Sequence, residues 1–245
     1  MIAPLLGAAN VDVGAHIART FLGMTINVDD LWSTVAAGLI VIGLGLAVRM
    51  RATSGVPGKL QLAFEAIVGS VESQIEQSMG DAGKPIVPLA VTLFMFILIA
   101  NWFELLPTGH NPQYLPAPTS DINLTAAAAV FVIVLVHVTW ISKQGLRSYL
   151  RHYFRPFAFL FPINVIEEIT KPITLALRLF GNIFSSAILL LLIADLIPAK
   201  LIVGIPVLDV VWKLFDGLFV SPVQAFIFTL LTILYFESAI AGSGH

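Results

Sequence analysis

In the stretch Lys171-Pro-Ile-Thr-Leu-Ala-Leu-Arg178-Leu-Phe-Gly-Asn182, one arginine stands inside a long apolar segment that runs from about Val165 to Ile197. A guanidinium keeps its proton at every accessible pH. Placing such a group inside a bilayer costs roughly 2.5–3.5 kcal/mol on insertion scales. The sequence therefore predicts that Arg178 is functional and that it faces an anionic partner.

Polar residues share one side of this predicted helix with Arg178. At about 100° per residue they all fall within about 40° of it. They are Glu167, Lys171, Thr174, Asn182 and Ser185. Because polar groups in a membrane must face protein or water, this stripe is expected to line a partner surface or an aqueous cavity.

No acid stands three or four positions from Arg178 in its own segment, so its partner lies elsewhere. One reading is an internal ion pair that holds the helices together. The candidates within the chain are Asp195, Asp209, Asp216 and Glu237. The other reading is a partner in another molecule.

The composition indicates a membrane protein. The 245 residues are 58% hydrophobic and 11% charged, with a mean hydropathy of +0.92. Soluble domains carry roughly 25% charged residues. The net charge of −2 argues against a nucleic-acid partner. With no cysteine, the chain can form no disulfide framework and no thiolate centre.

The predicted fold is all-α, a polytopic membrane protein in a single domain over residues 1–245. It has five transmembrane helices and one amphipathic surface helix. The predicted crossings are 31–48, 85–106, 121–141, 163–197 and 201–240, and the surface helix is 59–79. The last two crossings exceed what a bilayer core of about 30 Å requires, so both are expected to be steeply tilted.

Basic residues predict the orientation. Arg49 and Arg51 follow the first crossing, and the densest basic cluster begins at Lys143 after the third. The loop 107–121 contains no Lys or Arg. By the positive-inside rule, the N-terminus lies outside and the C-terminus lies in the cytoplasm. Asp121 is predicted to cap the third crossing, with Ser120 as the other candidate.

The last predicted helix carries a second polar set. Asp209, Lys213 and Asp216 share one face, with Gln224 one to two turns further along. Lys213 can simply neutralise either acid. Alternatively, an acid, water and Gln224 can conduct a proton part of the way across. His137, in the third crossing, is expected to be a helix-packing residue more than a proton site.

Covalent catalysis is not expected of this chain alone. The sequence contains no nucleotide-binding loop, no zinc spacing of His or Cys, and no Ser-His-Asp arrangement supported by spacing. No cofactor and no metal are predicted.

Several blocks together resemble subunit a of the F-type ATP synthase. They are Pro162–Glu168 followed by Lys171-Pro172, Leu177–Asn182, Asn101–Pro107, Pro118–Asn123 and Gln224–Phe228. The blocks arrive in family order and cover about residues 95–240. Residues 1–60 resemble the family only in pattern. The length and sequence style point to a bacterial member, with an actinobacterial look.

The resemblance implies a mechanism. Subunit a sits against a rotating ring of c subunits, and Arg178 corresponds to the essential arginine that faces the ring carboxylates. That arginine favours the ionised carboxylate and separates two offset half-channels. Ring rotation then couples proton flow to ATP synthesis elsewhere in the complex. The implied partners are the c ring, b-type stator subunits and the lipid bilayer, and the implied location is the bacterial plasma membrane.

The resemblance, together with the polar residues on the two long helices, assigns residues to the two half-channels. The inner set is Glu167, Glu168, Lys171 and Thr174. The outer set is Asn101, Glu104, Asp121, Asn123, Asn182, Asp195, Asp209, Asp216 and Gln224. One departure concerns an ionisable residue that many relatives carry about two turns beyond the arginine, since that place is Ala187 here. Its usual partner position is Gly217, so Asp216 or Asp195 is expected to substitute.

Two other functions fit the residues less well. In an independent secondary transporter, Arg178 would bind an anionic substrate, but the odd number of crossings and the absence of repeats speak against it. In a structural membrane anchor, Arg178 would form an internal ion pair. Co-purification with an oligomeric ring would distinguish the transporter hypothesis from the hypothesis that the chain is subunit a of an ATP synthase.

Overall fold

A computed structural model describes residues 18–21, 24–53, 55–106, 116–152, 159, 161–196 and 204–241. The chain begins there with two short antiparallel strands, β1 (Ala18–Phe21) and β2 (Met24–Asn27), with Ala18 opposite Asn27. This pair of strands is a departure from the predicted all-α fold. All secondary structure that follows in the described part is helical.

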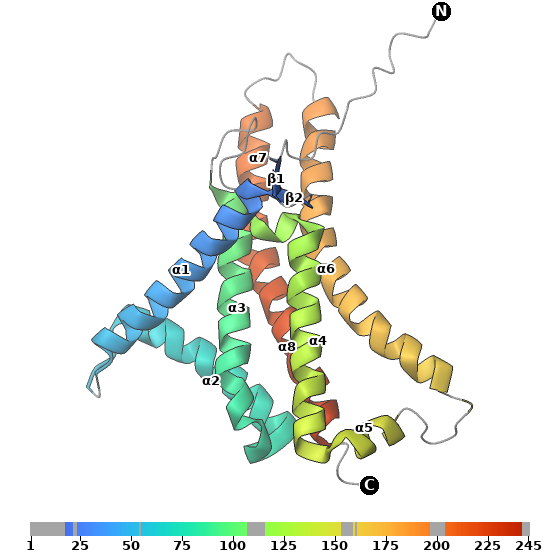
Figure 1. Ribbon diagram of the computed structural model, residues 1–245. Coiled ribbons are helices and arrows are strands. Elements are labelled where there is room, and N and C mark those ends of the chain that lie inside the picture. The colour runs from blue at the N-terminus through green and yellow to red at the C-terminus, as the bar shows by residue number, and fades with distance from the viewer. Residues whose placement is uncertain are drawn as a thin grey trace, which may run out of the picture.

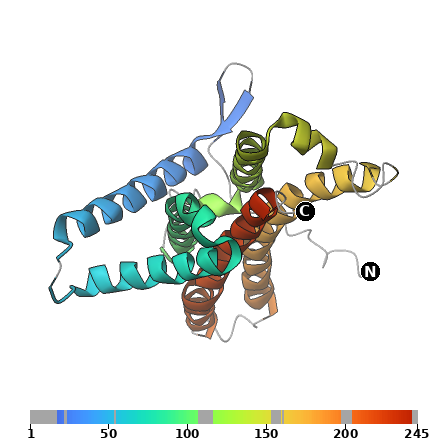
Figure 2. The same cartoon turned by 90° about the horizontal axis from the view of Figure 1, so that it is seen from below.

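Two helices extend away from the main bundle as an arm. α1 (Val28–Arg51) runs outward and α2 (Lys59–Met79) returns, and the views from the side and from below show them meeting at their far ends (Figures 1 and 2). Along α1, apolar side chains such as Leu39 and Ile42 are about 60% exposed. Exposed apolar side chains over the length of a helix are typical of contact with lipid.

The segment predicted as an amphipathic surface helix forms α2, but one of its polar residues is not solvated. Gln61 is buried, and its amide donates to the Thr53 carbonyl at 3.2 Å and to Glu65 at 2.7 Å. The helix packs on the bundle through the buried Val71 and Ile75.

The central bundle contains the other long helices. A 3₁₀ segment, η1 (Gly80–Ile86), leads into α3 (Val87–Trp102), which ends in η2 (Phe103–Leu105). A second 3₁₀ turn, η3 (Pro118–Ser120), precedes α4 (Ile122–Gln144), and the short α5 (Leu146–His152) follows. Gly145 lies between α4 and α5 with φ of 78°, a conformation that glycine adopts without strain.

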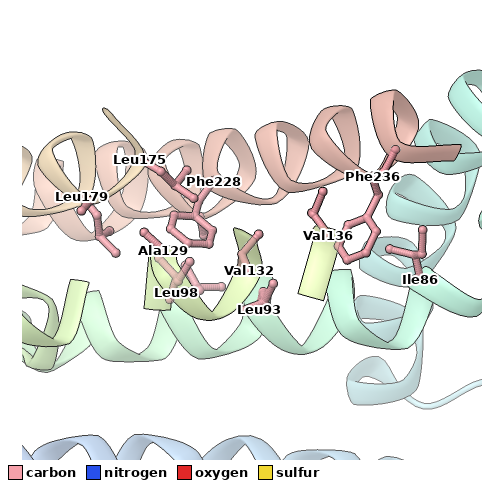
Figure 3. Close-up of a cluster of buried hydrophobic side chains, with 14 of the residues drawn as sticks. Ile86, Leu93, Leu98, Ala129, Val132, Val136, Leu175, Leu179, Phe228 and Phe236 are labelled. Carbon is pink, nitrogen blue, oxygen red and sulfur yellow. The ribbon is translucent and has the colours of Figure 1, made fainter. Parts of the chain in front are cut away.

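The core of the bundle is apolar and lies between α3, α4, α6 and α8. α6 (Phe161–Leu196) and α8 (Ser221–Ala241) contribute its other side chains. Figure 3 shows side chains from all four helices meeting there. They include Leu93, Leu98, Val132, Val136, Leu175, Leu179, Phe228 and Phe236.

α6 has 36 residues and is therefore about 54 Å long at about 1.5 Å per residue. A bilayer core is about 30 Å thick. In Figure 1 the N-terminal part of α6 diverges from α4, so the helix crosses the bundle obliquely. Pro172 stands inside it.

The last helix is continuous through a π-helical turn. α7 (Gly204–Phe215) passes into η6, a π segment over Asp216–Val220, and then into α8. The Ser221 N–H donates to the Asp216 carbonyl, five residues back. Pro222 follows and has no N–H to give the Leu218 carbonyl, which explains why regular α-helical bonding is interrupted here.

Four helical stretches of the described chain are long and apolar enough to cross a membrane. They are Val28–Arg51, Lys59–Leu105, Ile122–Gln144 and Val210–Ile240. The chain is therefore a polytopic helical membrane protein. Of the five predicted crossings, the one in α6 is not among these four.

Candidate functional site

Arg178 lies on the outer face of α6. Leu175 and Leu179 of the same helix are almost fully buried in the core. Thr174, Leu177 and Arg178 are exposed on the other side. Among the residues that the structure describes, none forms an ion pair with the Arg178 guanidinium. Asp216 and Glu237, the two predicted partners whose side chains are described, therefore form no ion pair with Arg178.

Gln224 connects α8 to α6 at the level of this arginine. Its side chain is 7% exposed, and its Nε2 donates to the backbone carbonyl of Arg178 at 2.9 Å. The bond holds the turn that carries Arg178 against the last helix. The guanidinium itself stays on the exposed face.

The inner set separates into two groups. Glu167 and Thr174 are exposed, and the Thr174 hydroxyl donates to carbonyls of its own helix. Glu168 is turned toward the bundle, where one carboxylate oxygen accepts from the Lys171 ammonium at 2.5 Å. The other oxygen lies 3.8 Å from Nε2 of His137 on α4.

At the opposite end of the bundle, Asn101 is 2% exposed. Its side-chain oxygen accepts from the Thr119 hydroxyl at 2.6 Å. Its Nδ2 is buried and has no hydrogen-bond partner within the described structure. The same holds for one carboxylate oxygen of Glu104 and for the hydroxyl of Ser221. Buried polar atoms without protein partners are characteristic sites for ordered water.

The π segment packs directly on the end of α3. Trp102 donates its indole N–H to the Gly217 carbonyl at 2.8 Å. A Cβ at Gly217 would lie 2.5 Å from both Cδ atoms of Leu105. Leu105 therefore occupies the space that a larger residue at position 217 would need.

Asp216 takes part in the neighbouring charge cluster. It is 5% exposed, and the Glu104 carboxyl group lies within electrostatic reach of both Asp216 and Lys213. The structure thus brings Glu104 and Asp216 together from helices that are far apart in the sequence. Of the two predicted substitutes for the missing ionisable residue, Asp216 has a described side chain in this cluster.

The predicted N-cap at Asp121 is confirmed. One carboxylate oxygen accepts from the Asn123 backbone N–H at 2.8 Å and from its side-chain amide at 2.9 Å. The other accepts from Asn27, which precedes α1, at 3.4 Å. Asp121 and Asn123 therefore fix the start of α4 and connect it to the start of α1.

Three predicted outer residues, Asn182, Asp195 and Asp209, have side chains outside the described part of the structure, as does Ala187. No group of three or more His, Cys, Asp or Glu side chains placed to hold a metal ion occurs among the described residues.

Sequence reasoning missed several polar residues near these clusters. Thr119, Ser221 and Trp102 had no place in the predicted site, and His137 was assigned to packing. All four are polar or hydrogen-bonding groups within or beside apolar helices, which is the signal that could have singled them out.

Known proteins resemble the chain over almost its whole length. Residues 31–237 match the family described as ATP synthase A chain. An ATP synthase subunit a of Acidothermus cellulolyticus is 53% identical over 243 residues, covering 99% of this chain and 88% of that protein. One from Mycobacterium tuberculosis is 46% identical, covering 95% and 94%. One from Moorella thermoacetica is 39% identical, covering 86% and 92%.

Proposed function

The chain belongs to the ATP synthase subunit a family, the proton-translocating component of the F0 sector, and we propose that Arg178 is the residue that faces the carboxylates of the rotating ring. The chain is a non-catalytic, multi-pass membrane subunit of a bacterial ATP synthase complex. The observation that carries the proposal is the exposed Arg178, which no described side chain neutralises, on the face of α6 opposite the core.

The chemistry of this residue suits the role. A guanidinium cannot lose its proton, so it cannot itself pass a proton across the membrane. It attracts an ionised ring carboxylate and disfavours the protonated one beside it. A proton must therefore leave the carboxylate on one side of Arg178 and be regained on the other. Leakage past the arginine is blocked, and ring rotation becomes coupled to proton flow.

The outer half-channel in this proposal follows the buried polar groups at the junction of α3, η6 and α8. Asn101, Glu104 and Ser221 each present a buried atom that lacks a partner in the described protein. Water bound at such atoms can link a titratable group to the next one. Asp216 takes over from the ionisable residue absent at Gly217, and Gln224 completes the path toward Arg178.

The inner half-channel follows the N-terminal part of α6, with Glu167, Glu168, Lys171 and Thr174. Glu168 is its most enclosed acid, and Lys171 keeps a positive charge beside it. We assign Asp121 and Asn123 mainly a structural role at the start of α4, because they hydrogen-bond to each other in the helix cap. Asn182, which matches a family position close to the arginine, stays in the proposed outer path, as do Asp195 and Asp209.

The proposed topology has five crossings, with α6 as the fourth and α7–η6–α8 as the fifth. The N-terminus lies outside and the C-terminus in the cytoplasm. Support comes from Arg49 and Arg51 at the end of α1 and from Lys143 in the last turn of α4. In Figure 1 the end of α4 lies at the same end of the molecule as the C-terminus, and α1 ends at the tip of the arm. α2 lies along the cytoplasmic surface in this proposal, and b-type stator subunits are among the partners.

A site-specific cross-link tests the ring contact. The chain has no native cysteine, so Leu177→Cys provides a single attachment point for a photoreactive group next to Arg178. The control is Ile42→Cys on α1, which is 60% exposed against 52% for Leu177. In membranes holding the whole complex, the group at 177 is expected to label the ring subunit and the group at 42 is not. Labelling of the ring from 42 alone would contradict the proposal.

A further inference from the structure

We infer that His137 is a second proton-exchanging residue of the inner half-channel and works together with Glu168. The inference rests on the proposed role of Glu168 and extends it to a residue of α4. It gives the inner path a pair of titratable groups on two different helices, where the sequence alone indicated acids on one helix.

The first support is a chain of contacts across four helices. His137 Nε2 lies 3.8 Å from one Glu168 oxygen, and the Lys171 ammonium holds the other at 2.5 Å. Lys171 in turn lies 5.9 Å from the centre of the Tyr235 ring on α8. The His137 ring contacts Tyr149 of α5 edge-on at 5.7 Å. Among the residues that the structure describes, these are the charged and titratable groups that face His137.

The second support is access. His137 and Glu168 both line an open cleft of about 630 Å³ between α4 and α6. The rest of its lining is apolar and comes from both helices, including Ile122 at the start of α4 and Leu177, next to Arg178, on α6. The two polar side chains are thus the places in this cleft where a proton can stop. Nδ1 of His137 is buried and has no hydrogen-bond partner in the described structure, so Nε2 is the atom that faces the cleft acid.

The exchange itself is a simple proton transfer. Protonated His137 gives the proton on Nε2 to the facing oxygen of Glu168, so that an N–H bond breaks and an O–H bond forms. Imidazolium and carboxylate become imidazole and carboxylic acid, and the reverse transfer restores them. The 3.8 Å separation is longer than a hydrogen bond, so one bridging water or a small rotation of the imidazole completes the contact. Histidine suits this step because its ordinary charge change lies closest to neutral pH.

The test uses inverted membrane vesicles with the complete complex, because their cytoplasmic face is in the medium. ATP-driven acidification is measured at medium pH values from about 6 to 9. The variants are His137→Gln and His137→Phe, each normalised to assembled complex. Phe keeps an aromatic ring against Tyr149 but carries no proton. Thr139→Ala is the matched control, since the Thr139 hydroxyl donates only to the Leu135 carbonyl of its own helix.

Both His137 variants are expected to pump at close to the parent rate near pH 6 and about tenfold slower near pH 8. At low pH, abundant protons reach Glu168 directly, whereas at higher pH the relay is needed. The loss stays below the roughly 10²–10⁴-fold of a sole acid–base group because Glu168 remains. A packing defect would lower the rate equally at all pH values. Adding His137→Gln to Glu168→Gln is expected to cause no further loss.

The outcomes separate the inference from the function on which it rests. If Glu168→Gln slows pumping but either assembled His137 variant keeps the parent pH profile, His137 is only a packing residue and the inner path stands without it. If Glu168→Gln itself pumps like the parent, the inner-path role of Glu168 is lost, and the inference about His137 is lost with it.

Discussion

Replacing Gly217 by alanine tests the packing that places the proposed outer path. The added Cβ would lie 2.5 Å from the Cδ atoms of Leu105 and 2.7 Å from its Cγ, whereas ordinary contact begins at 3.4 Å. Overpacking of this kind costs about 1–3 kcal/mol. A glycine-to-alanine change within a helix otherwise gains about 0.5–1 kcal/mol. We expect a net loss of about 1–2 kcal/mol in the free energy of unfolding.

The measurement is a titration of the purified chain in mixed micelles with a denaturing detergent. A loss of about 1–2 kcal/mol lowers the folded-to-unfolded ratio by roughly 5- to 30-fold. The matched control is Gly43→Ala on α1, where an added Cβ meets nothing within 4 Å. That variant is expected to be neutral or slightly stabilised.

A second substitution identifies the cause. Leu105→Ala removes the three atoms with which the new Cβ collides. The double variant Gly217→Ala with Leu105→Ala should therefore lose less than the sum of the two single changes, by about 1 kcal/mol or more. A strictly additive double variant, or a Gly217→Ala chain as stable as Gly43→Ala, would refute the close approach of the π segment to Leu105.

Three further substitutions each remove one hydrogen-bonding side chain and are measured in the same titration. Trp102→Phe removes the donor to the Gly217 carbonyl and should cost about 1–3 kcal/mol; an unchanged midpoint would mean that the carbonyl finds another donor. Asp121→Ala removes the cap of α4 and should cost about 0.5–2 kcal/mol, while Asp121→Asn should keep most of it; equal losses in both would argue against capping. Gln224→Leu removes the bond to the Arg178 carbonyl and should cost about 0.5–1.5 kcal/mol, and a stabilised variant would contradict that bond's role.

Residue type and helical spacing predicted those features of the fold and site that depend on residues close together in the sequence. Asp121 could be identified as a cap because the residue type and the start of the apolar run stand together. The exposed position of Arg178 agrees with the helical spacing that put Thr174 and Ser185 on the same side. The same spacing turns Glu168 by about 100° from Glu167, and the structure indeed separates the two acids.

Contacts between distant segments could not be read from the sequence. Trp102 and Gly217 are 115 positions apart, and nothing in either segment specifies that an indole meets a backbone carbonyl. The meeting of His137 with Glu168 depends on where α4 and α6 cross. The bonding pattern of the π segment follows from Pro222, which is local in the sequence. The lack of space for a side chain at Gly217, however, depends on Leu105 in the distant segment η2.

The most direct test of the central claim compares Arg178→Ala with the parent in ATP-driven acidification of inverted vesicles, after assembly of the complex has been checked. Thr170→Ala is the control, because this exposed residue of the same helix lies outside the polar stripe and donates its hydroxyl to the Ile166 carbonyl at 2.7 Å. We expect Arg178→Ala to assemble normally and to lose pumping, with Thr170→Ala unaffected. Pumping at the parent rate by Arg178→Ala would show that the arginine is structural and would contradict the account.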